Sequence, residues 1–476
     1  FVALGLLIRI SGQRLDRPDP SGLTDRRPYL LRGACALSLA LVVVAASAGY
    51  WGVAQADRLV AREDNPRRVV YEQRIVRGQI LDQDGEILAG VDRSGAGIVE
   101  RTYPVPEAAP VVGYASLRYG TGGIEATFDE ALRGETGRSV WDEALADLLH
   151  RPPQGRDVQL TLDRDLQQAA QHGLAGQAGA AVVLDARTGA VLAMASAPTF
   201  DPAALDAAWD DLREDPNAPL LNRATQGLYQ PGAALETVVL AEALERGLVR
   251  PADPVSGTVT GTVTINGLAV GCLMEPSPVG GIAAAYQAAC PAPFVALGEA
   301  LGKRGLAAAI ADWGLTASPP LELATESGTW SPEDDLGQEA IGQGSLTVSP
   351  LQMGLVVAAV ANRGQMPTPH LTLQAERVEG GWQPPVEPGP LRAPISAETA
   401  QSLLLCWRPY GDEVLGHLGT AVGGEGRRPH AWFLGVAPSG APQYAVVVLI
   451  EHPSDAAHAA QLGQMLLQAA LSGGLN

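Results

Sequence analysis

A serine and a lysine that activates it are one common pair for covalent acyl transfer. This chain contains a single lysine, Lys303. A serine one helical turn before a lysine can give its hydroxyl proton to the amine and then attack a carbonyl carbon. The residue three positions before Lys303 is Ala300, so the chain has no Ser-x-x-Lys segment. It has no Gly-x-Ser-x-Gly segment either. Neither common arrangement for serine acyl transfer is therefore present.

Charge and metal-binding residues narrow the function further. The chain of 476 residues has a formal net charge of −19, which argues against a nucleic-acid partner because a phosphate backbone is bound by basic surfaces. The seven histidines include no His-x-x-x-His pair, and the four cysteines lack metal-ligand spacing. We therefore expect no metal and no cofactor. Cys272 and Cys290 could form a disulfide outside the cell, which the sequence leaves open.

One segment has the length and composition of a membrane span. Residues Gly33 to Ala54 carry no charge and are about long enough to cross a hydrocarbon core of ~30 Å. Tyr50 and Trp51 near its far end suit the headgroup region. The residues before the span are rich in arginine, which indicates that they lie on the cytoplasmic side. We predict one transmembrane helix at 33–54, with the large C-terminal part extracytoplasmic.

The first ten residues, FVALGLLIRI, are apolar but too short to span a membrane alone. Residues Ala3 to Ser11 resemble the run that closes the last transmembrane helix of the SEDS glycan polymerases. This resemblance implies that residues 1–10 are the tail of a helix of an upstream polymerase in the same polypeptide, followed by a basic cytoplasmic linker at 11–32. The absence of a starting methionine agrees with a fragment of a longer reading frame. The alternative is an incidental hydrophobic tail.

Turn and strand signals divide the exported part into two domains. The Pro152-Pro153-Gln-Gly155 cluster is typical of a boundary, so we predict a juxtamembrane and pedestal domain at 57–152 and a larger domain at 153–476. In the pedestal, Asp84-Gly85 predicts a hairpin and residues 122–134 predict a short helix. In the larger domain, strand pairs far apart in the sequence with helices between them favour an α+β fold, an antiparallel sheet covered by helices. The predicted strands are 158–162, 181–185, 190–195, 431–436 and 444–450, and the predicted helices are 163–173, 237–246, 283–289, 293–313 and 455–471.

A series of short segments in a fixed order carries a family resemblance. They include Arg77-Gly78, Gly123-Ile-Glu125, Leu160-Thr-Leu-Asp163, Tyr229-Gln-Pro-Gly232, Ala340-Ile-Gly-Gln-Gly344 and His430-Ala-Trp-Phe433. From about Arg77 to His452 the sequence resembles the class B penicillin-binding proteins, the transpeptidases that cross-link peptidoglycan. The resemblance implies a pedestal that contacts a polymerase and a serine acyltransferase fold. It also implies that the ligand is peptidoglycan or its peptide stems, and that the protein lies in the bacterial cytoplasmic membrane.

The first catalytic motif of that family, Ser-x-x-Lys, follows Tyr-x-Pro-Gly. The matching positions here hold Ala233 and Glu236. Ala233 has no oxygen to acylate, and Glu236 could accept a proton but has no hydroxyl to take it from. We favour a structural interpretation, in which Pro231-Gly232 opens a helix and Glu236 in its first turn complements the positive helix end.

The second and third motifs are also degenerate. Ser-x-Asn corresponds to Ala289-Cys290-Pro291, in which Pro291 disfavours helix at Cys290. Cys290 is an alternative nucleophile, although a small buried cysteine is the commoner role. Lys-Thr-Gly corresponds to His417-Leu418-Gly419, and a histidine with an ordinary pKa of ~6.5 is mostly neutral at pH 7. If the cleft at these degenerate motifs still binds a ligand, the residues expected to contact it are Thr420, Gln343 and Gly344.

Three functions follow from these residues. Losing one member of a nucleophile–base unit already costs about 10⁶ in turnover. The preferred hypothesis is therefore a non-catalytic transpeptidase-like protein that supports or regulates a SEDS polymerase in peptidoglycan synthesis, during elongation or division. The second hypothesis is an active D,D-transpeptidase that forms peptide cross-links with atypical residues. The third is a module that binds wall peptides without a covalent bond.

Overall fold

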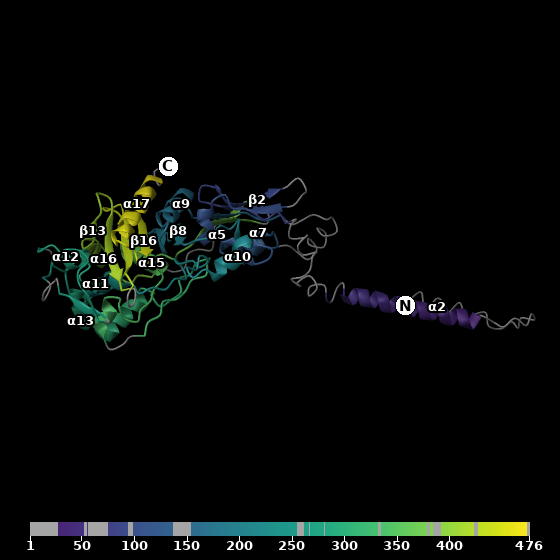
Figure 1. The fold of residues 1–476 in the computed structure, drawn as a ribbon, viewed down its shortest axis with the longest axis horizontal. Coiled ribbons are helices and arrows are strands. Elements are labelled where there is room, and N and C mark those ends of the chain that lie inside the picture. The colour runs from purple at the N-terminus through teal and green to yellow at the C-terminus, as the bar shows by residue number, and fades with distance from the viewer. Residues whose placement is uncertain are drawn as a thin grey trace, which may run out of the picture. The chain divides into compact units, whose positions relative to one another are not determined.

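The structure is a computed structural model that describes residues 27–51, 55, 75–93, 99–136, 154–254, 261–265, 267–279, 281–331, 335–377, 381–383, 392–422 and 427–473. It divides into two compact units, Phe1–Val70 and Tyr71–Asn476. The first unit contains helix α2 (Arg27–Gly49), whose stretch Arg32–Gly49 is long and apolar enough to cross a membrane (Figure 1). This agrees with the predicted span, although the helix already begins at Arg27. The predicted polymerase tail at 1–10 lies outside the described residues.

The first sheet of the second unit has six strands in the order β12-β11-β6-β1-β2-β3. Its strands are β1 (Ile80–Leu81), β2 (Ile87–Arg93), β3 (Val99–Thr102), β6 (Val158–Leu160), β11 (Thr372–Glu376) and β12 (Trp382–Gln383). The predicted hairpin is present, since β1 pairs with β2 in antiparallel fashion. Gly85 between them adopts a φ of 87°, a conformation that suits glycine. β6 pairs with β1, and β11 returns to pair with β6. Strands from both sides of residue 153 thus share one sheet, and the domain boundary stays a prediction.

Short elements lie between β3 and β6. They are η2 (Pro106–Ala108), α5 (Ala109–Val112), β4 (Tyr114–Ser116), β5 (Gly120–Gly122), α6 (Ile124–Thr127) and α7 (Asp129–Leu132). The helix predicted at 122–134 is two helices, because Phe128 leaves the helical conformation at φ −106° and ψ 21°. Glu125 on α6 is fully buried and forms ion pairs with Arg77 at 2.8 Å and Arg101 at 2.5 Å. This network ties the start of the unit to α6 and β3.

The second sheet has six antiparallel strands in the order β13-β14-β15-β16-β7-β8. Its strands are β7 (Gly179–Asp185), β8 (Val191–Ala197), β13 (Arg408–Pro409), β14 (Leu415–Ala421), β15 (His430–Ala437) and β16 (Tyr444–Ile450). The hairpin β7–β8 lies beside the C-terminal strands, because β16 pairs with β7. The predicted antiparallel sheet built from distant parts of the chain is confirmed.

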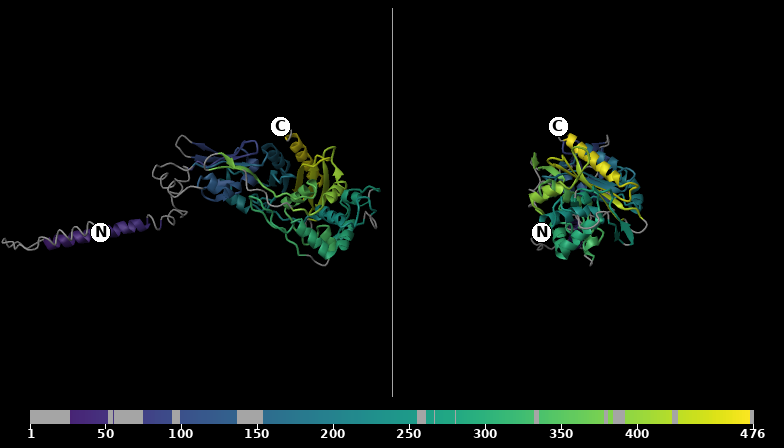
Figure 2. Two further views of the ribbon diagram at one scale, coloured as in Figure 1. Left: turned by 180° about the vertical axis from the view of Figure 1, so that it is seen from behind. Right: turned by 90° about the vertical axis from the view of Figure 1, so that its left-hand side faces the viewer.

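Helices cover both faces of this second sheet, as Figure 2 shows for α17 (Ala457–Gly473), drawn in yellow along one face. Successive side chains of a strand point to opposite faces, so Val183 packs with α17 and α9 (Arg164–Gly173), whereas Val182 packs on the side of α15 (Pro350–Ala361). The α+β fold is confirmed. The other helices are α10 (Leu205–Glu214), η3 (Gly232–Leu235), α11 (Glu236–Glu245), α12 (Gly281–Gln287), α13 (Pro291–Asp312), α14 (Leu336–Ala340) and α16 (Ala397–Leu404), with a separate hairpin of β9 (Val263–Ile265) and β10 (Leu268–Val270).

Candidate functional site

The candidate site begins where the chain turns into helix α11. Gly232 adopts a φ of 54°, and its backbone N–H donates to the carbonyl of Gly342 at 2.9 Å. A Cβ at Gly232 would overlap the carbonyl oxygen of Thr420, so this close approach to strand β14 requires glycine. The turn continues as η3 and then as α11 from Glu236, which gives the helix start predicted at Pro231-Gly232.

Strand β14 lies directly against this turn. A Cβ added to Gly419 would come within 2.8 Å of the Cβ of Ala233. The Nε2 atom of His417 is 2.9 Å from the carbonyl oxygen of Ala233. Leu418, between these two residues, points to the opposite face and packs with the cluster around α9 and α17. The structure therefore brings Ala233, His417 and Gly419 together and leaves Leu418 outside the site.

The third predicted segment forms the corner between α12 and α13. Ala289 has a φ of 48°, and Cys290 is extended. Pro291 is the first residue of α13, a helix position at which proline is common. The corner reaches the site through Tyr286, whose ring stacks on the His417 ring with centroids 4.1 Å apart and an interplanar angle of 10°. The hydroxyl of Tyr286 forms a 2.8 Å hydrogen bond with that of Thr237 on α11.

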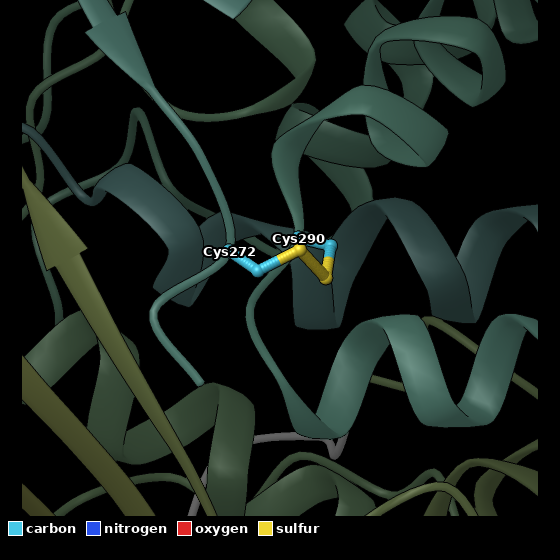
Figure 3. Close-up of a disulfide and its surroundings, with 2 residues drawn as sticks. All are labelled: Cys272 and Cys290. Carbon is cyan, nitrogen blue, oxygen red and sulfur yellow. A yellow bond between two sulfur atoms is a disulfide. The ribbon is translucent and has the colours of Figure 1, made fainter. Parts of the chain in front are cut away.

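Cys290 has no free thiol in this structure. Its sulfur forms a disulfide with Cys272, which lies on the segment that follows β10 (Figure 3). The pairing that the sequence left open is thus present. An alternative nucleophile at Cys290 would need this bond to be broken first, because the thiolate is the attacking species.

Burial removes the charges expected at the site. Glu236 is fully buried, and neither carboxyl oxygen has a hydrogen-bond partner among the described residues. Burial raises the pKa of this carboxyl well above its ordinary value, which favours the uncharged acid over the negative charge expected at the helix start. Burial also lowers the pKa of His417 to about 4, so the imidazole is neutral at pH 7.

A second group of predicted residues lies beside β14. The backbone N–H of Val422 donates to the side-chain oxygen of Gln343 at 3.2 Å. The side-chain amide of Gln230 donates to the carbonyl of Gly344 at 2.8 Å. Thr420 is half-buried at the end of the same strand. Gln343 and Gly344 therefore lie beside the end of β14, whereas the side chain of Thr420 shares the strand face of Leu418, because residues two apart in a strand point the same way.

Contacts that sequence reasoning did not predict hold the site in place. Tyr286 covers His417, and its only sequence signal is a single aromatic residue in an alanine-rich helix. Tyr229 donates its hydroxyl to Glu451 at 2.8 Å, and the guanidinium of Arg223 donates to the same carboxyl oxygen at 2.8 Å. These bonds anchor the chain two residues before Pro231. No local pattern could have indicated them, because Glu451 is more than two hundred positions away.

Comparisons with known proteins match this architecture over both parts of the second unit. A family model described as the penicillin binding protein transpeptidase domain matches residues 179–404, and one described as the penicillin binding protein A dimerisation domain matches residues 77–158. Peptidoglycan D,D-transpeptidase PbpA of Mycolicibacterium smegmatis is 34% identical over 490 residues, covering 94% of this chain and 99% of the relative. PbpA of Mycobacterium tuberculosis is 31% identical over 487 residues, covering 91% and 96%.

Solved structures agree with the sequence relatives. Penicillin-binding protein A from M. tuberculosis, as an imipenem acyl-enzyme complex, superimposes with a TM-score of 0.75 at 29% identity, covering 84% of this chain and 99% of that one. The D,D-transpeptidase domain of a peptidoglycan glycosyltransferase from Eggerthella lenta gives a TM-score of 0.74 at 28% identity, with 84% and 99% covered. The pedestal corresponds to the matched dimerisation domain, and the second sheet and its helices correspond to the transpeptidase fold. The chain therefore belongs to the class B penicillin-binding proteins, the D,D-transpeptidase family of peptidoglycan synthesis.

Proposed function

We propose that this protein is a non-catalytic member of its family that supports or regulates a SEDS glycan polymerase. Helix α2 anchors it in the bacterial cytoplasmic membrane, with the second unit outside the cell. The pedestal carries the contact with the polymerase, in the same polypeptide or in a separate one. At the family's catalytic positions this chain carries residues that cannot perform the family's reaction. They are Ala233, Glu236, Ala289, Pro291, His417 and Leu418.

One observation carries the proposal: the centre formed by η3, β14 and the α12–α13 corner contains no couple of a nucleophile and a base. Ala233 offers a methyl group to any substrate. Burial raises the pKa of Glu236 and favours its protonated form, and the sulfur of Cys290 is already bonded to that of Cys272. His417 carries no charge at pH 7 to bind a carboxylate, and Tyr286 covers its ring. An acyl-enzyme needs an activated oxygen or sulfur at this position, which these residues do not supply.

Labelling with a fluorescent penicillin tests the missing chemistry, because only a covalent adduct survives denaturation. The purified chain should give no labelled band that unlabelled penicillin competes away. The relevant comparison is the triple variant A233S/E236K/H417K, which restores a hydroxyl and two amines to the same backbone. A competed band in the unsubstituted chain would overturn the proposal.

The regulatory half of the proposal needs its own measurement. Glycan polymerisation by a SEDS polymerase in vesicles should change when this protein is reconstituted with it, and should be the same for the chain and for its variant Ala233→Gly. Unchanged polymerisation at saturating protein would remove the regulatory role. A dependence on residue 233 would instead indicate that the centre, not the pedestal, acts on the polymerase.

The relatives favour one alternative, an active D,D-transpeptidase that uses atypical residues. Penicillin-binding protein A from M. tuberculosis forms acyl-enzyme complexes with imipenem and penicillin G. The same labelling experiment decides this alternative, and mass spectrometry of the labelled protein would identify the residue that reacts.

A second alternative is a module that binds wall peptides without a covalent bond. The observation that favours it is the half-exposed edge around Thr420, where Gln343 and Gly344 also lie. Titration with a muropeptide should then show saturable binding that Thr420→Val weakens. Binding that is equally strong in this variant, or absent, would exclude this edge as the binding site.

A further inference from the structure

The hairpin β9–β10 leads into a segment that is bonded to the α12–α13 corner of the candidate site. The hairpin forms a two-stranded sheet of its own, apart from the two larger sheets. After it, the backbone N–H groups of Leu273 and Met274 both donate to the carbonyl of Ala288, at 3.0 and 3.1 Å. Cys272 forms the disulfide with Cys290 (Figure 3). We call residues 267–274 the strap.

The strap is fastened to a corner whose backbone is strained. Ala289 has a φ of 48°, a left-handed conformation that a residue with a Cβ rarely adopts. The next residue, Cys290, precedes α13, and its side chain forms no hydrogen bond to the N–H groups of the first turn of that helix. The hydrogen bonds to Ala288 and the disulfide at Cys290 flank Ala289 on both sides. The strap is therefore placed to hold a conformation that the corner would not keep by its own preference.

The inner side of the same corner closes the site. Tyr286 lies on the last turn of α12, and the backbone N–H of Ala289 donates to its carbonyl at 3.0 Å. Its ring covers His417 on β14, and its hydroxyl contacts Thr237 beside Glu236. A movement of the corner therefore moves the ring that seals the buried groups of the centre.

We propose that the Cys272–Cys290 disulfide is a redox-controlled latch, which keeps Tyr286 over the centre while it is intact and lets the centre open when a dithiol reduces it. The reduction transfers two electrons and two protons from the dithiol, which itself becomes a disulfide, and leaves one thiol at Cys272 and one at Cys290. The latch concerns regulation of the same centre as the proposed function, but it does not depend on whether that centre performs catalysis.

Hydrogen–deuterium exchange of the full chain, read by mass spectrometry, tests the latch. Reduction with dithiothreitol should raise exchange roughly ten-fold at 281–290 and 415–421, because these amides would open locally. Exchange at β16 (Tyr444–Ile450), in the centre of the second sheet, should stay the same. The variant C272S/C290S should exchange like the reduced protein and should not respond to the reductant. The variant C406S, which removes the buried free cysteine, should respond like the unsubstituted chain.

Three results would overturn the latch. One is equal protection at 281–290 and 415–421 in the oxidised and reduced proteins. Another is a loss of protection that extends equally to β16, since the disulfide would then stabilise the whole domain rather than this corner. The third is a response to dithiothreitol in C272S/C290S. The proposed function fails separately: acylation of the reduced protein by a fluorescent penicillin would contradict the absence of catalysis and leave the latch in place.

Discussion

Two fully buried glutamates of this protein have opposite surroundings. Glu125, in the pedestal, lies between the guanidinium groups of Arg77 and Arg101. The carboxyl oxygens of Glu236, in the candidate centre, have no hydrogen-bond partner among the described residues, and burial raises the pKa of this group. The pedestal thus holds a buried carboxylate between paired cations, whereas the centre holds a carboxyl group whose charge burial disfavours. This difference agrees with the proposed function, in which the pedestal contacts the polymerase and the centre performs no reaction.

The largest expected effect comes from breaking the pedestal network. Glu125→Gln should lower the free energy of unfolding by about 3–5 kcal/mol, because the guanidinium of Arg101 loses its charged partner and that of Arg77 keeps only Asp129. Urea denaturation measures the change. The control is Glu135→Gln, because Glu135 pairs with Arg133 near the surface. This variant should lower the free energy of unfolding by less than about 1 kcal/mol. Similar losses in the two variants would contradict the special role of the buried network.

The second effect concerns acid and the centre. Burial lowers the pKa of His417 to about 4, whereas an unfolded histidine titrates near ~6.5. Protons therefore bind the unfolded chain first, so this group's contribution to stability is complete above pH ~6.5 and is lost as the pH falls towards 4. His417→Gln should remove a loss on the order of 3 kcal/mol between these pH values. The control variant His172→Gln, at an exposed histidine, should keep this loss of stability at low pH. If the stability of His417→Gln depends on pH as steeply as that of the unsubstituted chain, His417 is not the buried group responsible.

The third effect has the opposite sign of pH dependence. The folded chain raises the pKa of Glu236, so only the unfolded chain ionises this group as the pH rises above ~4.5, and stability falls. Glu236→Leu should raise the free energy of unfolding by about 1–3 kcal/mol at pH 7, by removing an unsatisfied buried polar group. The gain should grow as the pH rises above ~4.5, in parallel denaturation series. A destabilised leucine variant would mean that the carboxyl is satisfied in solution.

The smallest effect separates the inner and outer parts of the pedestal network. Asp129 also pairs with Arg77, at 2.7 Å, but about a third of its side chain is exposed. Asp129→Asn should cost less than about 1 kcal/mol, and high salt should reduce the cost further because exposed pairs are screened. A cost as large as that of Glu125→Gln would erase the distinction between buried and exposed partners.

Local patterns predicted the parts of the fold that local sequence controls. The run Tyr444–Ile450 is continuously apolar because β16 is buried on both faces, and it forms the predicted strand. Asp163 accepts a hydrogen bond from the N–H of Leu166, as expected of the residue that caps the predicted helix. Gly85 marks its hairpin because a glycine tolerates the positive φ of the turn.

The candidate site could be predicted only in part. The family resemblance pointed to Ala233 and His417, and the fold brings them together. The closure of the centre could not be read from the chain, because Tyr286 and His417 are more than one hundred positions apart and meet only through the packing of α12 on β14. The neutral state of Glu236 also depends on neighbours, since the same residue on an exposed helix would be ionised. Spacing could not decide whether Cys272 pairs with Cys290.

Gly232 has a consequence for antibiotics. Its backbone fits between Gly342 and strand β14, so the outline of the turn around Ala233 is set by main-chain contacts and not by the side chain at position 233. A search for drug targets by molecular outline would select this protein. Under the proposed function, penicillin would find no side chain at the centre to acylate, so in a treated bacterium the pool of this protein would stay unmodified while its acylable relatives were consumed.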